Sequence, residues 1–276
     1  MKNINFKKIF LMLTMISVAA LFAACTNNEI QETLAHTGRG YVLEYSDSND
    51  IQNQFQGSTK TFDNKKEAFT FALNNLLMNL IVPGDVTQLT YDKKYGNISD
   101  NTFAICDING DGSDELIVKW TTAAQQDTLL IVCRFDEKTK TLYQTLIETA
   151  ASDFYNNGKV IALWADPGTS YGKYFWPFSV YEYDKRGGYY TKTAMVTAWS
   201  KELKPVDSNG NPYPDDIDTE NAGEVYLLND FSKADIQTIS RSAYEKWIGE
   251  ITKSGKCNID YKSLTKENIN QVGNVK

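Results

Sequence analysis

The chain of 276 residues contains a single histidine, His36, and four cysteines, with no Cys-x-x-Cys pair. Zinc centres are built from closely spaced cysteines and histidines, so the composition argues against zinc. Runs of basic residues are also missing beyond the first eight positions. Nucleic-acid binding needs clustered Lys and Arg to neutralise phosphates, so we expect no nucleic-acid partner.

The first 24 residues have the features of a secretory signal peptide. Lys2, Lys7 and Lys8 form a basic start, and residues 9–24 form an apolar run without a charge. The run is shorter than the ~20 apolar residues that a membrane span needs, which argues against a retained membrane helix. We therefore expect residues 1–24 to be removed from the mature protein.

The segment Leu21-Phe-Ala-Ala-Cys25 resembles the lipobox of bacterial lipoproteins, although Phe22 stands where that family usually has Leu. The resemblance implies that Cys25 is lipidated and becomes the new N-terminus. It also implies export and a lipid anchor in a bacterial membrane, either the outer membrane or the outer face of the cell membrane. Residues 25–40 would then be a polar, lipidated tether. A plain signal peptide cut after Ala24 is the alternative.

The mature chain is acidic and holds an odd number of other cysteines. Removal of the three leader lysines from 28 basic residues leaves 25 against 35 acidic ones, a net charge of −10. An acidic surface suits solubility and divalent-ion binding. Cys106, Cys133 and Cys257 allow at most one intramolecular disulfide. A Cys106–Cys133 bridge is one interpretation, and two buried thiols in apolar strands is the interpretation that we favour.

A ten-residue segment, Asp107-Ile-Asn-Gly-Asp-Gly-Ser-Asp-Glu-Leu116, has the pattern of a loop that binds a hard cation. Asp107, Asn109 and Asp111 place oxygen donors at alternate positions, and Gly112 permits a sharp turn. Ca²⁺ takes six to eight oxygen ligands, which alternate side chains of a curling loop can supply. An EF-hand is excluded, because its twelfth position requires Glu and the chain has Val118 there.

The segment is similar instead to the calcium loops of FG-GAP and VCBS-type repeat proteins, in which a strand leads into D-x-N-x-D-G-x-x-D/E-L and a strand leads out. This resemblance implies side-chain ligands from Asp107, Asn109, Asp111 and Glu115, and a carbonyl ligand from Ser113. It covers ten residues, and one copy cannot close a propeller, so it implies a metal site and no fold. An isolated loop would bind Ca²⁺ weakly, with a Kd of ~10⁻⁴–10⁻³ M. A calcium-free loop of Asx-turns is the alternative.

Two other motifs are weaker. Alternating oxygen donors recur at Asp207, Asn209, Asn211, Asp215 and Asp218, but Pro212 stands where glycine is wanted, so we interpret the segment as a solvated acidic loop. Gly168–Gly172 matches the G-x-S-x-G pattern of hydrolases. The histidine that would activate its serine is missing downstream, so we interpret it as a glycine-rich loop.

Hydrophobic periodicity predicts an α+β fold with a single antiparallel β-meander sheet, flanked by an N-terminal and a C-terminal helix, in one domain over residues 41–276. The predicted helices cover 64–81 and 232–251, with Asn64 and Ser232 as caps. The predicted strands cover 41–45, 102–106, 116–120, 129–135, 141–147, 160–164, 175–183, 189–199 and 225–228.

The aromatic residues between 164 and 190 are dense enough to suggest a surface for a glycan or protein ligand. Core packing is the interpretation that we favour, with the Tyr181 and Tyr183 face as the candidate for exposure. We predict a membrane-anchored, non-catalytic binding or presentation module. The alternative is an envelope hydrolase that acts on glycan or peptide through carboxylates, although no pair of acids stands out. The aromatic residues concerned are Trp164, Tyr171, Tyr174, Phe175, Trp176, Tyr181, Tyr183, Tyr189 and Tyr190.

Overall fold

The computed structural model of the chain describes residues 60–85, 88–165, 172–207 and 209–272. The predicted signal peptide, the tether with Cys25 and the predicted strand at 41–45 lie outside these residues. In chain order the elements are α3 (Lys65–Asn79), η1 (Lys93–Tyr95), η2 (Ile98–Asp100), β1 (Thr102–Cys106), β2 (Glu115–Trp120), η3 (Gln125–Asp127), β3 (Leu129–Asp136), β4 (Thr141–Thr149), β5 (Ser152–Phe154), β6 (Lys159–Leu163), β7 (Phe178–Asp184), β8 (Tyr189–Ser200), β9 (Glu224–Asp230), β10 (Gln237–Ile239), α4 (Arg241–Thr252), β11 (Lys262–Ser263) and α5 (Lys266–Val272).

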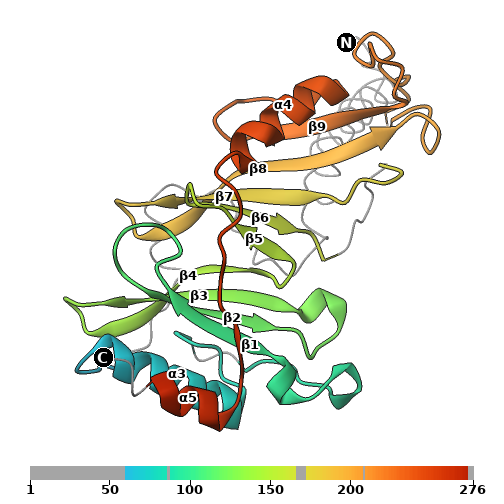
Figure 1. Ribbon diagram of the computed structural model, residues 1–276. Helices are drawn as coiled ribbons and strands as arrows, with labels where there is room; N and C mark the ends of the chain where they lie inside the picture. Colours follow the sequence, from blue (N-terminus) through green and yellow to red (C-terminus); the bar gives the residue numbers. More distant parts are fainter. Residues whose placement is uncertain (1–59, 86–87, 166–171, 208, 273–276) are drawn as a thin grey trace, which may run out of the picture.

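The strands form two antiparallel sheets that stack between layers of helix (Figure 1). One sheet has the order β11-β1-β2-β3-β4, and the other has the order β10-β9-β8-β7-β6-β5. Helices α3 and α5 cover the outer face of the first sheet, and α4 covers the outer face of the second. The α+β class and the antiparallel meander are therefore confirmed, and the prediction of a single sheet is wrong.

The sheet divides after β4, where only two residues separate Thr149 from Ser152. The Ser152 hydroxyl donates to the Thr149 carbonyl at 2.7 Å, which closes this turn. The division follows from the apolar character of the central strands. Leu130 and Val132 face the second sheet, while Ile131 and Cys133 face the helices, so the first sheet must be covered on both sides.

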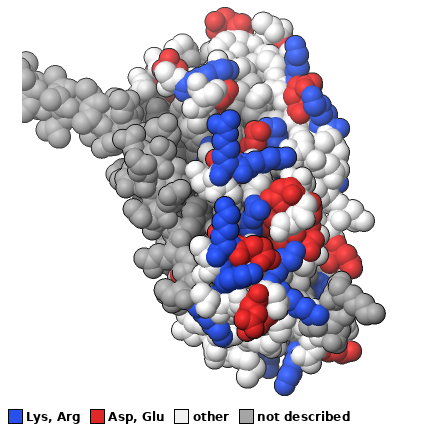
Figure 2. Space-filling view, turned by 90° about the vertical axis from the view of Figure 1, so that its left-hand side faces the viewer, with Lys and Arg blue, Asp and Glu red and all other residues white. Residues whose placement is uncertain are grey.

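Charged side chains of both signs are mixed on the face of the molecule that Figure 2 shows. Lys and Arg alternate there with Asp and Glu. The described residues form several ion pairs, such as Lys159 with Glu182 at 2.6 Å. A face of mixed sign lacks the continuous basic surface that binds phosphates.

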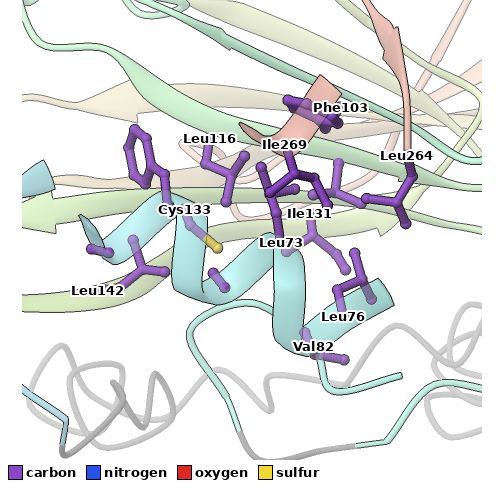
Figure 3. Packing of buried hydrophobic residues seen from close by; sticks show 14 of the residues in the cluster. Leu73, Leu76, Val82, Phe103, Leu116, Ile131, Cys133, Leu142, Leu264 and Ile269 are labelled. Atoms are coloured by element: carbon purple, nitrogen blue, oxygen red, sulfur yellow. The ribbon is translucent and has the colours of Figure 1, made fainter. Parts of the chain in front are cut away.

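The first core lies between α3, α5 and the first sheet (Figure 3). Leu73 and Leu76 of α3 point toward Phe103, Leu116 and Ile131 of the strands, and all five are at most 1% exposed. Helix α3 begins where the sequence predicts. The Asn64 side chain accepts a hydrogen bond from the Glu67 backbone at 2.9 Å, which satisfies a free amide of the first turn.

The second core lies between the two sheets. Ala104, Ile117 and Leu130 of the first sheet pack with Val160 and Tyr181 of the second. Tyr183 and Tyr190 belong to the same cluster, and they are only 7% and 5% exposed. The tyrosine face is thus covered by the other sheet, and the prediction that it is the exposed one is wrong.

The C-terminal part of the chain departs from the prediction. Helix α4 begins after Ser240, whose hydroxyl accepts from the Ala243 amide at 3.3 Å. Ser232, the predicted cap, instead donates to Asp230 in a turn, and β10 occupies residues within the predicted helix. Helix α5 follows in the described part of the tail. None of the described helices is long and apolar enough to span a membrane.

Candidate functional site

The Asp107–Glu115 segment is a loop between two paired strands, as the sequence predicts. It joins β1 to β2, and its ends meet at the Cys106↔Glu115 pair of the ladder. Gly110 and Gly112 have φ angles of 72° and 87°, which side-chain-bearing residues rarely adopt. The two glycines therefore let the backbone curl around the acidic side chains.

The side chains of this loop hold the backbone in successive Asx-turns. The Asp107 carboxylate accepts hydrogen bonds from the amides of Gly110, Asp111 and Gly112 at 2.8, 3.1 and 2.8 Å. Asn109 Oδ1 accepts from the Asp111 amide at 2.9 Å, and Asp111 Oδ1 accepts from the Ser113 amide at 2.9 Å. The loop is therefore folded into a defined shape by its own oxygen donors.

Glu115 is the first residue of β2, at the end of the loop, and it is fully buried. Its carboxylate accepts a hydrogen bond from the Ile108 amide at 3.1 Å and another from Asn109 Nδ2 at 3.0 Å. Burial raises the pKa of Glu115 from 4.5 to about 7; the Ile108 amide opposes this rise, and the charge of Asp111 adds to it. A buried carboxylate beside two aspartates favours the approach of a cation.

Arg134 supplies one such cation from within the protein. Its guanidinium lies 2.6 Å from Asp111 Oδ2, and both side chains are largely buried, with exposed fractions of 25% and 14%. The Tyr183 hydroxyl donates to the same oxygen at 3.2 Å and is also a hydrogen-bond partner of Arg134. Asp111, in the loop that joins two strands of the first sheet, is thus tied to β7 of the second. Asp114, by contrast, points outward and pairs with Lys65 of α3 at 3.1 Å.

The donor set fits a hard cation by its chemistry. Asp107 Oδ2, Asn109 Oδ1 and Asp111 Oδ1 each accept one hydrogen bond from the described residues, and an sp² oxygen has two lone pairs. Each of the three oxygens can therefore accept a metal ion as well. No group of three carboxylate, histidine or cysteine side chains within the described ranges is already gathered in an arrangement that would hold an ion. Coordination would thus need the side chains to draw closer.

The second acidic loop does not bring its donors together. Asp207 accepts from Asn209 and Asn211 in a turn of its own, and its pKa is lowered by these hydrogen bonds against the effect of burial. Asp218 is turned inward and accepts from the Tyr213 hydroxyl at 3.0 Å. Asp215 pairs with Lys201 at 2.6 Å. Ser170 of the G-x-S-x-G segment lies outside the described residues.

Most of the predicted aromatic cluster is core. Trp164 is 9% exposed, and its indole donates to the Ser179 hydroxyl at 3.1 Å. Tyr189 is half-buried, and two residues are exposed: Tyr174 by 90% and Trp176 by 40%. The Trp176 indole donates to the Trp164 carbonyl at 2.6 Å, which fixes its orientation at the surface. Tyr171 lies outside the described residues.

The sequence did not indicate Arg134 or Tyr183 as part of the loop's surroundings. Arg134 belongs to β3, the neighbour of β2 in the first sheet, and Tyr183 belongs to β7 of the second sheet, which only the stacking of the two sheets brings to Asp111. The alternation of Arg134 with apolar neighbours in β3 is the one local signal of an inward-facing charge. Comparison of the chain with protein-family models, with curated proteins and with solved structures gives no match.

Proposed function

We propose that this chain is an exported, lipid-anchored protein of the bacterial cell envelope, in which the loop 107–115 binds Ca²⁺ as a structural clamp. The single observation that carries the calcium proposal is the shape of the loop. Asp107, Asn109 and Asp111 each turn back onto the backbone of the loop, next to the buried Glu115, and an oxygen of each of these three side chains keeps acceptor capacity. The group lies where the first sheet meets the second, so a bound ion would strengthen that junction.

The clamp is distinct from a calcium sensor. A single loop without a second site gives weak binding, with a Kd of ~10⁻⁴–10⁻³ M. This Kd lies in the range of calcium-binding modules that work outside the cell. Asp107, Asp111 and Glu115 would give their carboxylate oxygens, Asn109 its amide oxygen and Ser113 its carbonyl. The ion would offset the repulsion among three neighbouring carboxylates, which Arg134 alone offsets in part.

Equilibrium dialysis with radioactive ⁴⁵Ca²⁺ tests the binding. We expect one ion per chain, lost in Asp107→Ala. Asp114→Asn is the matched control, because Asp114 belongs to the same loop but points to Lys65. Equal loss of binding in both variants would indicate a non-specific effect of loop charge, and no binding by the parent chain would refute the clamp.

The anchor rests on the leader sequence and has its own test. Cells that express the full chain are fed a labelled fatty acid, and the protein is isolated from membranes. We expect label on the parent chain and none on Cys25→Ser. Release of an unlabelled parent chain into the soluble fraction would favour the plain signal peptide.

The anchored module is proposed to bind or present, and not to catalyse. The observation in favour of binding is the exposure of Tyr174 and Trp176, whose rings are suited to stacking on sugars. Retention on immobilised chitin, cellulose and xylan, compared between the parent chain and Tyr174→Ala, tests this contact. Met78, which is 75% exposed on α3, provides the control variant Met78→Ala. Equal retention of all three proteins would exclude the contact.

A further inference from the structure

The chain between α4 and β11, residues 253–261, runs across both sheets, and we refer to it as the strap (Figure 1). At its start it is attached to the second sheet. The backbone of Lys256 forms an isolated antiparallel β-bridge with Tyr155, and the Cys257 amide donates to the Phe154 carbonyl at 2.8 Å. At its end it leads into β11, which pairs with β1 of the first sheet. The strap thus spans the junction between the sheets.

The inner side of the strap carries one of the three cysteines that the structure describes. Cys257, Ile259 and Tyr261 are partly buried, whereas the residues between them are exposed. These three side chains pack against the core between the sheets, and Cys106 at the end of β1 packs against the same core. Two cysteines that are 151 positions apart in the sequence therefore share one cluster.

The register of the strands places these two cysteines close to each other. Thr102 pairs with Ser263 and Phe103 with Lys262; the same antiparallel register, extended beyond this described pairing, would set Cys106 opposite Ile259. Cys257 is then the diagonal neighbour on the same face, at a typical Cα separation of about 7–8 Å.

Cys133 is separated from this pair. It is fully buried in the other core, on the face of the first sheet that α3 covers, and its thiol lies 3.2 Å from the Pro83 carbonyl. The Cys106–Cys133 bridge considered from the sequence is therefore excluded by the arrangement, because the two side chains lie on opposite faces of the sheet.

We propose that Cys106 and Cys257 are a disulfide-forming pair, which locks the strap onto β1 in an oxidising compartment. The structure has both as free thiols. A disulfide needs a Cβ–Cβ distance of about 3.5–4.5 Å, so the strap must shift toward β1 as the bond forms. The described pairing of β1 with this part of the chain ends at Phe103, so no ladder hydrogen bond to the strap holds Cys106, whereas the Cys257 amide is held by its hydrogen bond to Phe154.

The reaction is thiol–disulfide exchange. One cysteine thiolate attacks a sulfur of an oxidant that itself contains a disulfide, such as oxidised glutathione, and forms a mixed disulfide with release of one thiol. The second cysteine then attacks the mixed disulfide, which forms the Cys106–Cys257 bond and releases the second thiol. The two cysteines lose two protons and two electrons, and the disulfide of the oxidant is reduced to two thiols.

Peptide mapping of the full chain tests the pair directly. The detergent-purified protein is incubated with oxidised glutathione, alkylated, digested without reductant and analysed by mass spectrometry. We expect a linked peptide that contains Cys106 and Cys257 and disappears on reduction, while Cys133 is alkylated only after unfolding. The bond closes a loop of about 150 residues, so oxidation should raise the Tm by about 5–15 °C.

Variants separate this bond from other effects of oxidation. Cys106→Ser and Cys257→Ser should each lose the linked peptide and the rise in Tm, whereas the control Cys133→Ser should keep both. The parent chain decides the matter even if a variant fails to fold. A linked peptide that includes Cys133, or complete alkylation of Cys106 and Cys257 after oxidation, would overturn the proposal. The result does not depend on calcium, so its failure would leave the clamp unaffected.

Discussion

Replacement of Glu115 by Gln should change how stability depends on pH in the absence of Ca²⁺. Burial raises the pKa of Glu115 in the folded chain from 4.5 to about 7. Below pH 4.5 the group is protonated in the folded and unfolded states alike and does not lower the free energy of unfolding. Between pH 4.5 and 7 the unfolded chain loses the proton and the folded chain keeps it, so the free energy of unfolding falls as the pH rises.

The size of this effect follows from the change in pKa. A rise from 4.5 to about 7 corresponds to about 3 kcal/mol of unfolding free energy, lost between pH 4.5 and pH 7 and constant above. Glutamine has nearly the same shape and no charge. Its side-chain oxygen can still accept from the Ile108 amide, which lies 3.1 Å from the carboxylate. The variant should therefore lack this loss of stability.

Urea denaturation in EDTA at pH 4.5, 6 and 8 measures the difference between the parent chain and Glu115→Gln. The advantage of the variant should grow by about 3 kcal/mol over this range, because other titrating groups contribute equally to both proteins. Asp114→Asn, at the outer side of the same loop, should run parallel to the parent. Parallel curves for Glu115→Gln as well would refute the assignment of a buried, uncompensated charge to Glu115.

Substitutions at three further positions test other parts of the account, each by urea denaturation. Arg134→Met leaves Asp111 without its cation and should lower the unfolding free energy in EDTA by about 1–3 kcal/mol. The same substitution should increase the stabilisation that Ca²⁺ gives. An unchanged response to Ca²⁺ would show that Arg134 is not part of the site. Leu73→Ala, at a site with no exposure, should cost about 2–5 kcal/mol, and a cost below 1 kcal/mol would contradict the packing of α3. Asn64→Ala removes the cap of α3 and should cost about 1 kcal/mol, whereas Asn64→Asp should cost little.

Local sequence signals predicted the local structure well. The N-cap at Asn64, the strands on both sides of the Asp107 loop and the inward turn of Glu115 follow from spacing within a few residues. The division into two sheets was not predicted, because alternation of apolar residues indicates which strands are half-buried but not which sheet covers them. For the same reason the tyrosines of β7 were assigned to a solvent face.

The surroundings of the loop could not be predicted for a related reason. Arg134 reaches Asp111 from the neighbouring strand β3 of the same sheet, and Tyr183 reaches it from the second sheet; the two residues are 23 and 72 positions away in the sequence. The start of α4 was misplaced because Ser232 with Asp235 has the same capping spacing as a true helix start. In the structure, Ser232 lies in a turn with Asp230, and the residues after it form a strand that pairs Gln237 with Leu228.

The most direct test of the calcium clamp is thermal melting of the chain from Thr26 onward in EDTA, in Mg²⁺ and in a Ca²⁺ concentration series. Ca²⁺ should raise the Tm in the millimolar range, by an amount equivalent to ~1–3 kcal/mol of linkage, and Mg²⁺ should not. The rise should be absent in Asp111→Ala. The highest Ca²⁺ concentration should be about 10 mM, at least ten times the expected Kd. The same Tm in EDTA and at this concentration would contradict the clamp and leave the loop as a set of Asx-turns.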